Sequence, residues 1–280
     1  MIKTQNKYKL GVRAKSPRTF SPTQTLYKTV VAHLRKTLEL TEKDIEDWIK
    51  PYATIVGEQK ECDLELRKQN PAEFFLNLTI PNNFEDYAIA LHSYWINYNI
   101  PKNEIKENGN SDEDFPEEDF SRINWKDFYQ SKQIDFELNS AILSSVEWKR
   151  PFKQLNNELF PGEGLFDEEH LNSLVETINE IYGNQEIEIF YTFLSTNDWE
   201  KDLIFTGRIN DLPNLIKKES LRLTPSLIYP KERNWVVNTD YDLAFTTIGG
   251  EKKFISELVR KNENEIYQIE RRKNVLQQHI

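Results

Sequence analysis

The stretch from residue 167 to residue 259 constrains the fold most, because its hydrophobic pattern changes from a helical period to short alternating runs. A helix is predicted between Asp167 and Gly183, since Asp is a favoured N-cap and Gly often ends a helix. Its apolar stripe consists of Leu171, Leu174, Val175, Ile178, Ile181 and Tyr182. This spacing places one apolar face against a core and predicts a helix that packs on other elements.

Two strand pairs are predicted after this helix. Residues 186–195 and 202–209 read as one hairpin, and residues 234–238 and 244–248 read as a second. A turn at Gly249–Gly250 and a helix from Glu251 are expected to follow the second hairpin. Helices and hairpins in separate runs predict an α+β fold, with a C-terminal part of antiparallel hairpins packed by short helices.

The N-terminal part reads as mainly helical. Apolar residues recur at helical spacing in residues 25–40 and again in residues 84–98, so both segments are predicted to be helices. Between them, residues 73–80 form a short apolar run that ends at Pro81, and this run predicts a strand or a buried extended segment.

An acidic segment divides these two parts. Residues 104–119 carry eight acidic residues and one lysine, with few apolar side chains. Such a composition is typical of a surface loop or a linker. The predicted organisation is therefore a helical N-terminal domain at 1–101, an acidic linker or loop at 102–120, and an α+β C-terminal domain at 121–280.

A basic segment at the N-terminus offers one candidate interaction. Residues 1–38 carry nine basic residues and no acidic residue. Phosphate contacts by such an arm would support nucleic-acid binding. The basic residues are dispersed, however, and the acidic segment of the same chain is available to pair with them, so nucleic acid is the less favoured partner.

The same sequence argues against a membrane-spanning protein and against a protein stabilised by disulfides. No run approaches the roughly 18 apolar residues that a transmembrane helix needs, and no apolar signal segment follows Met1. The single cysteine, Cys62, has no second thiol for a disulfide or a zinc site. A cytoplasmic protein is expected.

No established catalytic or cofactor motif is present. The sequence lacks a phosphate-binding loop and a nucleophile elbow, and its four histidines do not form a ligand pair. His92 is expected at the boundary of a helix. His170 is expected next to Asp167, which can satisfy its hydrogen-bonding groups. We therefore predict no catalytic residues, no metal and no cofactor, and leave open whether the chain is an enzyme.

Polar residues around the second hairpin are the best candidates for chemistry. Asp240 and Asp242 are two residues apart, so in an extended segment their side chains share one side and could share a proton or a cation. Gly249, Gly250 and Lys252 lie at a strand-to-helix junction, where backbone N–H groups can hold an anion. Arg208 would complete a polar pocket. The alternative is structural, because Asp and Gly both favour turns.

Aromatic residues near the hairpin turns form a second set of candidates. Trp199 and Trp235 lie in the first and second predicted hairpins. Tryptophan near a turn can anchor a protein interface, or can cover a core while its polar tip reaches water. Both interpretations remain open from the sequence.

Residues 229–250 contain a Trp-x-x-x-Thr-Asp-x-Asp pattern from Trp235 to Asp242 before Gly249–Gly250. Together with residues 191–199 and 206–208, this segment resembles a widespread family of uncharacterised bacterial proteins. The resemblance covers about residues 187–269. Such proteins look like those found as immunity or accessory proteins beside bacterial toxins, and the resemblance implies a shared fold.

Two main functions are therefore expected. The first is a non-catalytic protein-binding module, such as an immunity-type inhibitor that blocks a basic bacterial toxin, with an acidic partner surface. The residues of that surface are Asp112, Glu113, Asp114, Glu117, Glu118 and Asp119. The alternative is a small-ligand-binding protein or enzyme whose polar pocket is formed by Asp240, Asp242 and the Gly249–Gly250 turn.

Overall fold

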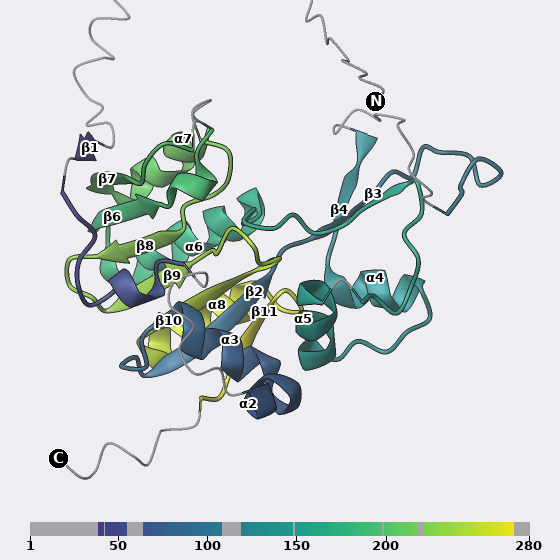
Figure 1. The fold of residues 1–280 in the computed structure, drawn as a ribbon, viewed down its shortest axis with the longest axis horizontal. Coiled ribbons are helices and arrows are strands. Elements are labelled where there is room, and N and C mark those ends of the chain that lie inside the picture. The colour runs from purple at the N-terminus through teal and green to yellow at the C-terminus, as the bar shows by residue number, and fades with distance from the viewer. Residues whose placement is uncertain are drawn as a thin grey trace, which may run out of the picture. The chain divides into compact units, whose positions relative to one another are not determined.

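A computed structural model describes residues 39–41, 43–54, 64–107, 119–147, 149–197, 199–217 and 221–271. All of them belong to one compact unit of the chain. They form an α+β fold with two antiparallel sheets (Figure 1). None of the helices in these ranges is long and apolar enough to cross a bilayer.

The larger sheet has eight strands in the order β1-β7-β6-β8-β9-β10-β2-β11. Their bounds are β1 Glu39–Thr41, β2 Asp86–Leu91, β6 Glu186–Tyr191, β7 Leu203–Arg208, β8 Leu227–Pro230, β9 Trp235–Asn238, β10 Phe245–Gly250 and β11 Ile266–Ile269. Every neighbouring pair is antiparallel. The smaller sheet has the order β4-β3-β5, with β3 at Tyr94–Ile96, β4 at Ser121–Ile123 and β5 at Glu158–Leu159.

Helices cover both faces of the larger sheet. The helices are α2 Leu64–Gln69, α3 Pro71–Thr79, α4 Trp125–Ser131, α5 Leu138–Val146, α6 Glu168–Tyr182, α7 Leu212–Ile216 and α8 Lys252–Lys261, with short 3₁₀ turns at Lys50–Tyr52, Phe193–Ser195 and Ile209–Asp211. One core contains α6, α7 and α8 side chains, and the other contains residues of α3, α4 and α5. Because side chains alternate along a strand, β2 supplies Ala88 and Ala90 to the first core and Ile89 to the second.

Most predicted C-terminal elements are confirmed. Helix α6 begins after Asp167 and ends at Gly183, whose φ of +75° suits glycine. β6 pairs with β7 and β9 pairs with β10, as the two hairpins require. The first strand is shorter than predicted, because Phe193–Ser195 turns into a 3₁₀ helix. Helix α8 follows the second hairpin.

Two predictions for the N-terminal part are wrong. The segment 84–98 contains β2 and β3 rather than a helix, because β2 lies between β10 and β11 and is buried on both faces. A strand covered on both sides has no polar face, so its apolar run also matches a helical period. Conversely, residues 73–79 belong to α3, and Ile80 is its extended C-cap residue. Asn70 caps this helix by accepting from the Glu73 amide, and Pro71 occupies its first position.

The predicted helix at 25–40 lies outside the described residues up to position 38, and positions 39 and 40 belong to β1. The domain boundary at 102–120 stays a prediction. Hydrogen bonds nevertheless join strands on its two sides, since β2 pairs with β10 over six residue pairs.

Candidate functional site

The residues of the predicted polar pocket lie at two ends of one strand. Asp240 and Asp242 occupy the turn between β9 and β10, whereas Gly249 and Gly250 are the last two residues of β10. Five residue steps of strand span about 17 Å, so the turn and the glycines are far apart. The structure does not bring these two groups into one pocket.

The two aspartates also differ in exposure. Asp240 is only 2% exposed, and its Oδ1 accepts from the backbone N–H of Asp242 at 3.0 Å. Asp242 is exposed. Burial and the negative charge of Asp242 raise the pKa of the nearby Glu163 carboxyl. A buried aspartate that accepts from the backbone two residues ahead is a typical turn feature.

The glycines are not at a turn, which corrects the sequence prediction. They are buried in β10, and packing explains both of them. A Cβ on Gly249 would lie 2.7 Å from the ring of Phe84, and a Cβ on Gly250 would lie 2.6 Å from the ring of Phe254. The backbone N–H of Lys252, at the start of α8, already donates to the Glu85 carboxylate at 3.0 Å. The carboxylate of Glu85 thus occupies the position at the start of α8 where an external anion would bind.

Trp235 and Arg208 have structural partners. Trp235 is fully buried at the start of β9, and its Nε1 donates to Oε1 of Gln185 at 2.8 Å. Arg208 ends β7, where it donates to the Asn184 carbonyl at 2.7 Å and lies 3.6 Å from Glu186. Trp235 pairs with Gly250, and Arg208 pairs with Glu186, so neither residue lies beside the turn at Asp240.

Trp199 is different, because its side chain is 56% exposed on the connection between β6 and β7. Its φ of +56° places a bulky side chain in the left-handed region, which is a rare and costly conformation. The guanidinium of Arg222 lies 5.3 Å from its ring centroid, within cation–π range. Phe193 on the same connection is 41% exposed. We call Trp199 and Arg222 the Trp199 surface.

Backbone hydrogen bonds hold the Trp199 surface in place. The amides of Arg222 and Leu223 both donate to the Ser195 carbonyl at 3.2 Å, and the amide of Phe193 donates to Asp202 at 2.7 Å. Thr196 forms an isolated bridge with Leu221. These bonds join two segments of the chain, so the aromatic and cationic groups are presented on a fixed framework.

The predicted acidic surface cannot be placed. Residues 112–118 lie outside the described residues, and only Asp119 is described, with an exposed side chain. Cys62 likewise lies outside the described residues.

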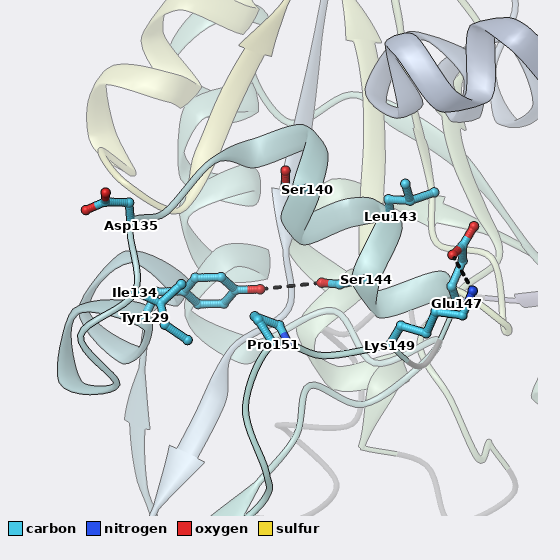
Figure 2. A pocket seen from close by; sticks show the side chains of 9 residues that line it. All are labelled: Tyr129, Ile134, Asp135, Ser140, Leu143, Ser144, Glu147, Lys149 and Pro151. Atoms are coloured by element: carbon cyan, nitrogen blue, oxygen red, sulfur yellow. Dashed lines mark hydrogen bonds and ion pairs between the residues drawn. The ribbon is translucent and has the colours of Figure 1, made fainter.

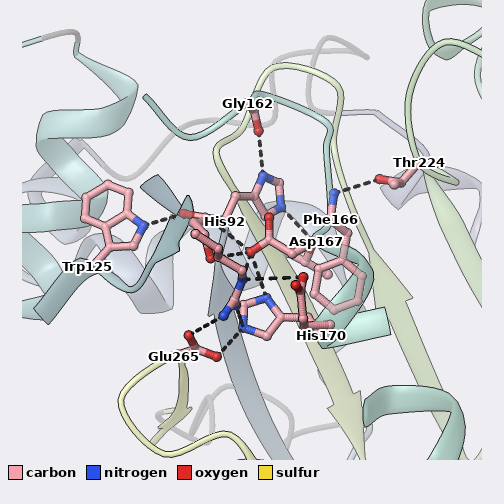
Figure 3. A network of polar contacts seen from close by, with 12 residues as sticks. His92, Trp125, Gly162, Phe166, Asp167, His170, Thr224 and Glu265 are labelled. Carbon is pink, nitrogen blue, oxygen red and sulfur yellow. Dashed lines mark hydrogen bonds and ion pairs between the residues drawn. The ribbon is translucent and has the colours of Figure 1, made fainter. Parts of the chain in front are cut away.

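A chain of buried hydrogen bonds surrounds His92 (Figure 3). Nδ1 of His92 donates to the Gly162 carbonyl at 2.7 Å, so in the neutral ring Nε2 accepts from Thr246 at 3.0 Å. The hydroxyl of Thr239 then donates to Thr246 at 2.8 Å. Burial is the main influence on His92 and lowers its pKa from 6.5 to about 4.

A neutral histidine bonded to a hydroxyl is also the arrangement of an activated nucleophile. Here His92 and Thr246 are both 0% exposed, and Thr239 is 2% exposed. A substrate would have to open the fold to reach them. Their contacts instead join β2, β10 and the loop at Gly162, so the group stabilises the end of the sheet. His92 lies just after a strand, not at a helix boundary as predicted.

A second group of charged side chains, only part of it buried, surrounds Arg122 of β4. Its guanidinium lies 2.7 Å from Glu265, 3.4 Å from Asp167 and 3.6 Å from Glu169. His170 lies among them, with Nδ1 at 3.3 Å from Asp167 and Nε2 at 3.1 Å from Glu265. The predicted proximity of His170 to Asp167 is confirmed. We call Arg122, Asp167, Glu169, His170 and Glu265 the Arg122 cluster.

The Arg122 cluster has the carboxylates and imidazole of a metal site, but its cation is a guanidinium. In the described ranges, no group of three or more His, Cys, Asp or Glu side chains is arranged to hold a metal ion. Asp167 does not cap α6 with its side chain. Instead its Oδ2 accepts from the backbone and the hydroxyl of Ser93, at 2.9 and 2.5 Å.

An open hollow of about 370 Å³ lies between α4, α5 and the segment at Pro151 (Figure 2). It is lined by Tyr129, Ile134, Asp135, Ser140, Leu143, Ser144, Glu147, Lys149 and Pro151. The hydroxyl of Tyr129 faces Ser144 at 3.4 Å, and burial raises the pKa of Tyr129. Its charged lining residues, Asp135, Glu147 and Lys149, are exposed, so the hollow has no buried charge with which to orient a ligand.

Several of these residues could not be found from local sequence signals. Arg122, Glu265 and Arg222 lie far along the chain from the groups they contact. Trp199 is identified from the sequence because a tryptophan near a turn can anchor an interface. Arg222 carries no comparable motif.

Comparison with protein-family models, with curated proteins and with solved structures finds no match for this chain. The resemblance of residues 187–269 to a bacterial family therefore stays a prediction.

Proposed function

We propose that this chain is a non-catalytic protein-binding module whose Trp199 surface contacts its partner. The observation that carries the proposal is the exposed indole of Trp199, held in a left-handed backbone conformation beside Arg222. Tryptophan and arginine are the residues most enriched at the centres of protein interfaces. A strained backbone persists where the surrounding structure enforces it, and such sites concentrate at functional positions.

We further propose that the partner is a basic protein, such as a bacterial toxin, and that binding takes place in the cytoplasm and blocks it. The net charge of −10 and the acidic residues between 104 and 119 support this choice, because they would steer a basic partner toward the chain. The Trp199 surface would supply the desolvated anchor, while the acidic segment would mainly set the association rate and its dependence on salt.

The alternative of a polar ligand pocket is less well supported. It needs Asp240, Asp242 and the Gly249–Gly250 segment to converge, and they lie at opposite ends of β10. The hollow beside Tyr129 contains none of those residues.

Affinity capture from source-cell lysate at low and high salt, followed by mass spectrometry, tests the proposal. Three baits are compared: the wild type, Trp199→Ala, and Tyr98→Ala as a control. Tyr98 is 67% exposed, so its loss removes a comparable exposed aromatic elsewhere. One basic protein retained by the wild type and by Tyr98→Ala, but reduced at least tenfold with Trp199→Ala, is the expected result. Equal retention by all three baits would contradict the role of Trp199.

The proposed partner charge has a separate test. Replacing the acidic residues between 112 and 119 with Asn and Gln should weaken capture at low salt and flatten the salt dependence, because long-range attraction is lost. An unchanged salt dependence would show that the acidic segment plays no part in binding. The proposed role of the Trp199 surface would be unaffected.

A further inference from the structure

A carboxylate lies on an otherwise apolar face of β6. Side chains alternate along a strand, so Glu188 shares a face with Phe190, and Phe190 belongs to the core that also contains Leu227 and Val236. The Glu188 side chain is only 2% exposed. Burying a carboxylate among apolar side chains is costly unless a cation pairs with it. This position in the sheet therefore requires a cation.

The two carboxylate oxygens of Glu188 have different partners. Oε2 accepts from the hydroxyl of Tyr229, which is the register partner of Glu188 on β8, at 3.0 Å. Oε1 accepts from the ammonium group of Lys43. Because Tyr229 takes one oxygen, a single oxygen is left to bind a cation. A compact ammonium group suits one oxygen, whereas the fork of a guanidinium suits both oxygens of a carboxylate.

The space that the Lys43 side chain fills beside Glu188 and Tyr229 is called the Glu188 slot below. The Lys43 side chain is 40% exposed, so this slot is open to solvent at one end and reaches a buried carboxylate at the other. The alkyl stem of a lysine is unbranched. The slot therefore has the shape of a short unbranched chain that ends in an ammonium group.

The backbone on either side of Lys43 has attachments that do not involve its side chain. Before Lys43, strand β1 pairs with β7. After it, Glu46 contacts Arg233 at 2.5 Å, and Ile49 is fully buried. The Lys43 side chain can therefore leave the Glu188 slot while the backbone that carries it stays in place.

We propose that the Glu188 slot is a binding site for a free primary alkylamine in its ammonium form, and that Lys43 is the internal occupant that this ligand replaces. Oε1 of Glu188 accepts from the ammonium group, and Tyr229 holds the carboxylate in position. A lysine of another protein has the same end group. With the same stem length, however, it would place its own backbone where the backbone of Lys43 already lies.

Lys43 weakens the binding of an external amine because it competes for the same oxygen. A ligand that binds only when Lys43 has left has its apparent affinity reduced by the fraction of molecules in which the slot is empty. Lys43→Ala removes this competition. The substitution deletes Cγ, Cδ, Cε and Nζ, and n-propylammonium has the same heavy atoms, so this ion fits the space that the variant opens.

Thermal unfolding of the full-length Lys43→Ala protein, with n-propylammonium chloride compared against NaCl at equal ionic strength and neutral pH, tests the site. At about 100 mM amine the unfolding midpoint should rise by at least about 3 °C, and the rise should saturate. The same concentration of n-propanol, which has the same chain without the charge, should give no rise. If the variant is unfolded without the amine, a cooperative transition that appears on its addition is the same result.

Two further variants are matched controls. Lys43→Met removes the charge but fills the Glu188 slot with an apolar chain, so n-propylammonium should not raise its midpoint. Lys43→Ala/Glu188→Gln keeps the empty space but lacks the carboxylate, so it should not respond either. The wild type should need at least a tenfold higher amine concentration than Lys43→Ala for the same rise, because Lys43 must first leave.

A capped lysine, Nα-acetyl-lysine methylamide, separates a free amine from a lysine carried by a protein. It should be at least tenfold less effective than n-propylammonium on Lys43→Ala. Absence of a rise with n-propylammonium, or an equal rise in Lys43→Ala/Glu188→Gln, would overturn the site. A wild type that responds at the same concentration as Lys43→Ala would overturn the role of Lys43. Equal action of the capped lysine would overturn the assignment to a free amine.

Discussion

Lys43 donates to the carboxylate of Glu188, a residue 145 positions away and only 2% exposed in the middle of β6. Tyr229 of β8 also donates to Glu188, at 3.0 Å. Trp48 packs edge-on against Tyr229 with ring centroids 5.5 Å apart, and Arg233 contacts Glu46 at 2.5 Å. Residues 43–54 are thereby fastened across the face of the larger sheet.

Lys43→Met should therefore destabilise the fold, because it leaves the buried Glu188 carboxylate without its cation. Removing one partner of a fully buried pair costs about 3–5 kcal/mol. Since the Lys43 side chain is 40% exposed, solvent screens the pair, and we expect a cost of about 1–2 kcal/mol. Urea unfolding measures this. The double variant Lys43→Met/Glu188→Gln should recover most of the loss, and additive losses would argue that the two residues act independently.

The stability of the fold should fall as the pH is lowered from about 6.5 to about 4. Burial lowers the pKa of His92 to about 4, so below pH 6.5 the unfolded chain takes up a proton that the folded chain excludes. A pKa shift of this size corresponds to about 3 kcal/mol of unfolding free energy. This contribution is fully present above pH 6.5 and is lost as the pH falls to about 4. Unfolding free energies measured at intervals from pH 7.5 to pH 4 test the slope.

His92→Gln is the control for this pH effect. It should lower stability at pH 7.5, because the bonds to Gly162 and Thr246 are disturbed, while flattening the dependence between pH 6.5 and pH 4. An equally steep loss in His92→Gln would assign the effect to other groups.

Gly250→Ala should destabilise the junction of β10 and α8. The added Cβ would lie 2.6 Å from the ring of Phe254, which is fully buried, so the ring or the helix must shift. Overpacking of this kind costs about 1–3 kcal/mol. Thermal unfolding measures the loss. Combining Gly250→Ala with Phe254→Leu should cost less than the sum of the two single changes, and strict additivity would contradict the packing explanation.

The C-terminal half of the fold could be predicted because its signals are local. Helix α6 shows one apolar stripe between Asp167 and a glycine, and the β6–β7 and β9–β10 pairs are each formed by strands that follow one another in the sequence. Strand β2 could not be identified, since its partners β10 and β11 are more than 150 residues away and hydrophobic cores cover both of its faces. Burial of both faces removes the alternation that marks a strand.

The sites depended even more on distant contacts. Asp167 was correctly placed at the start of α6, yet its side chain bonds Ser93 rather than the helix amides. Its other partner, Arg122, comes from a separate sheet. Pairings between segments so far apart leave no trace in residue spacing. Trp199 was singled out from the sequence as a candidate interface residue, and the structure exposes its side chain.

The central claim is that Trp199 is kept in an unfavourable conformation because its indole binds a partner. Trp199→Gly separates the two effects, since glycine adopts a φ of +56° without strain. The most direct measurement is titration calorimetry of the captured partner against this variant, alongside its urea unfolding curve. We predict affinity at least tenfold weaker than wild type, with a free energy of unfolding that is equal or higher by up to about 1 kcal/mol. Undiminished affinity in a folded Trp199→Gly protein would contradict the account.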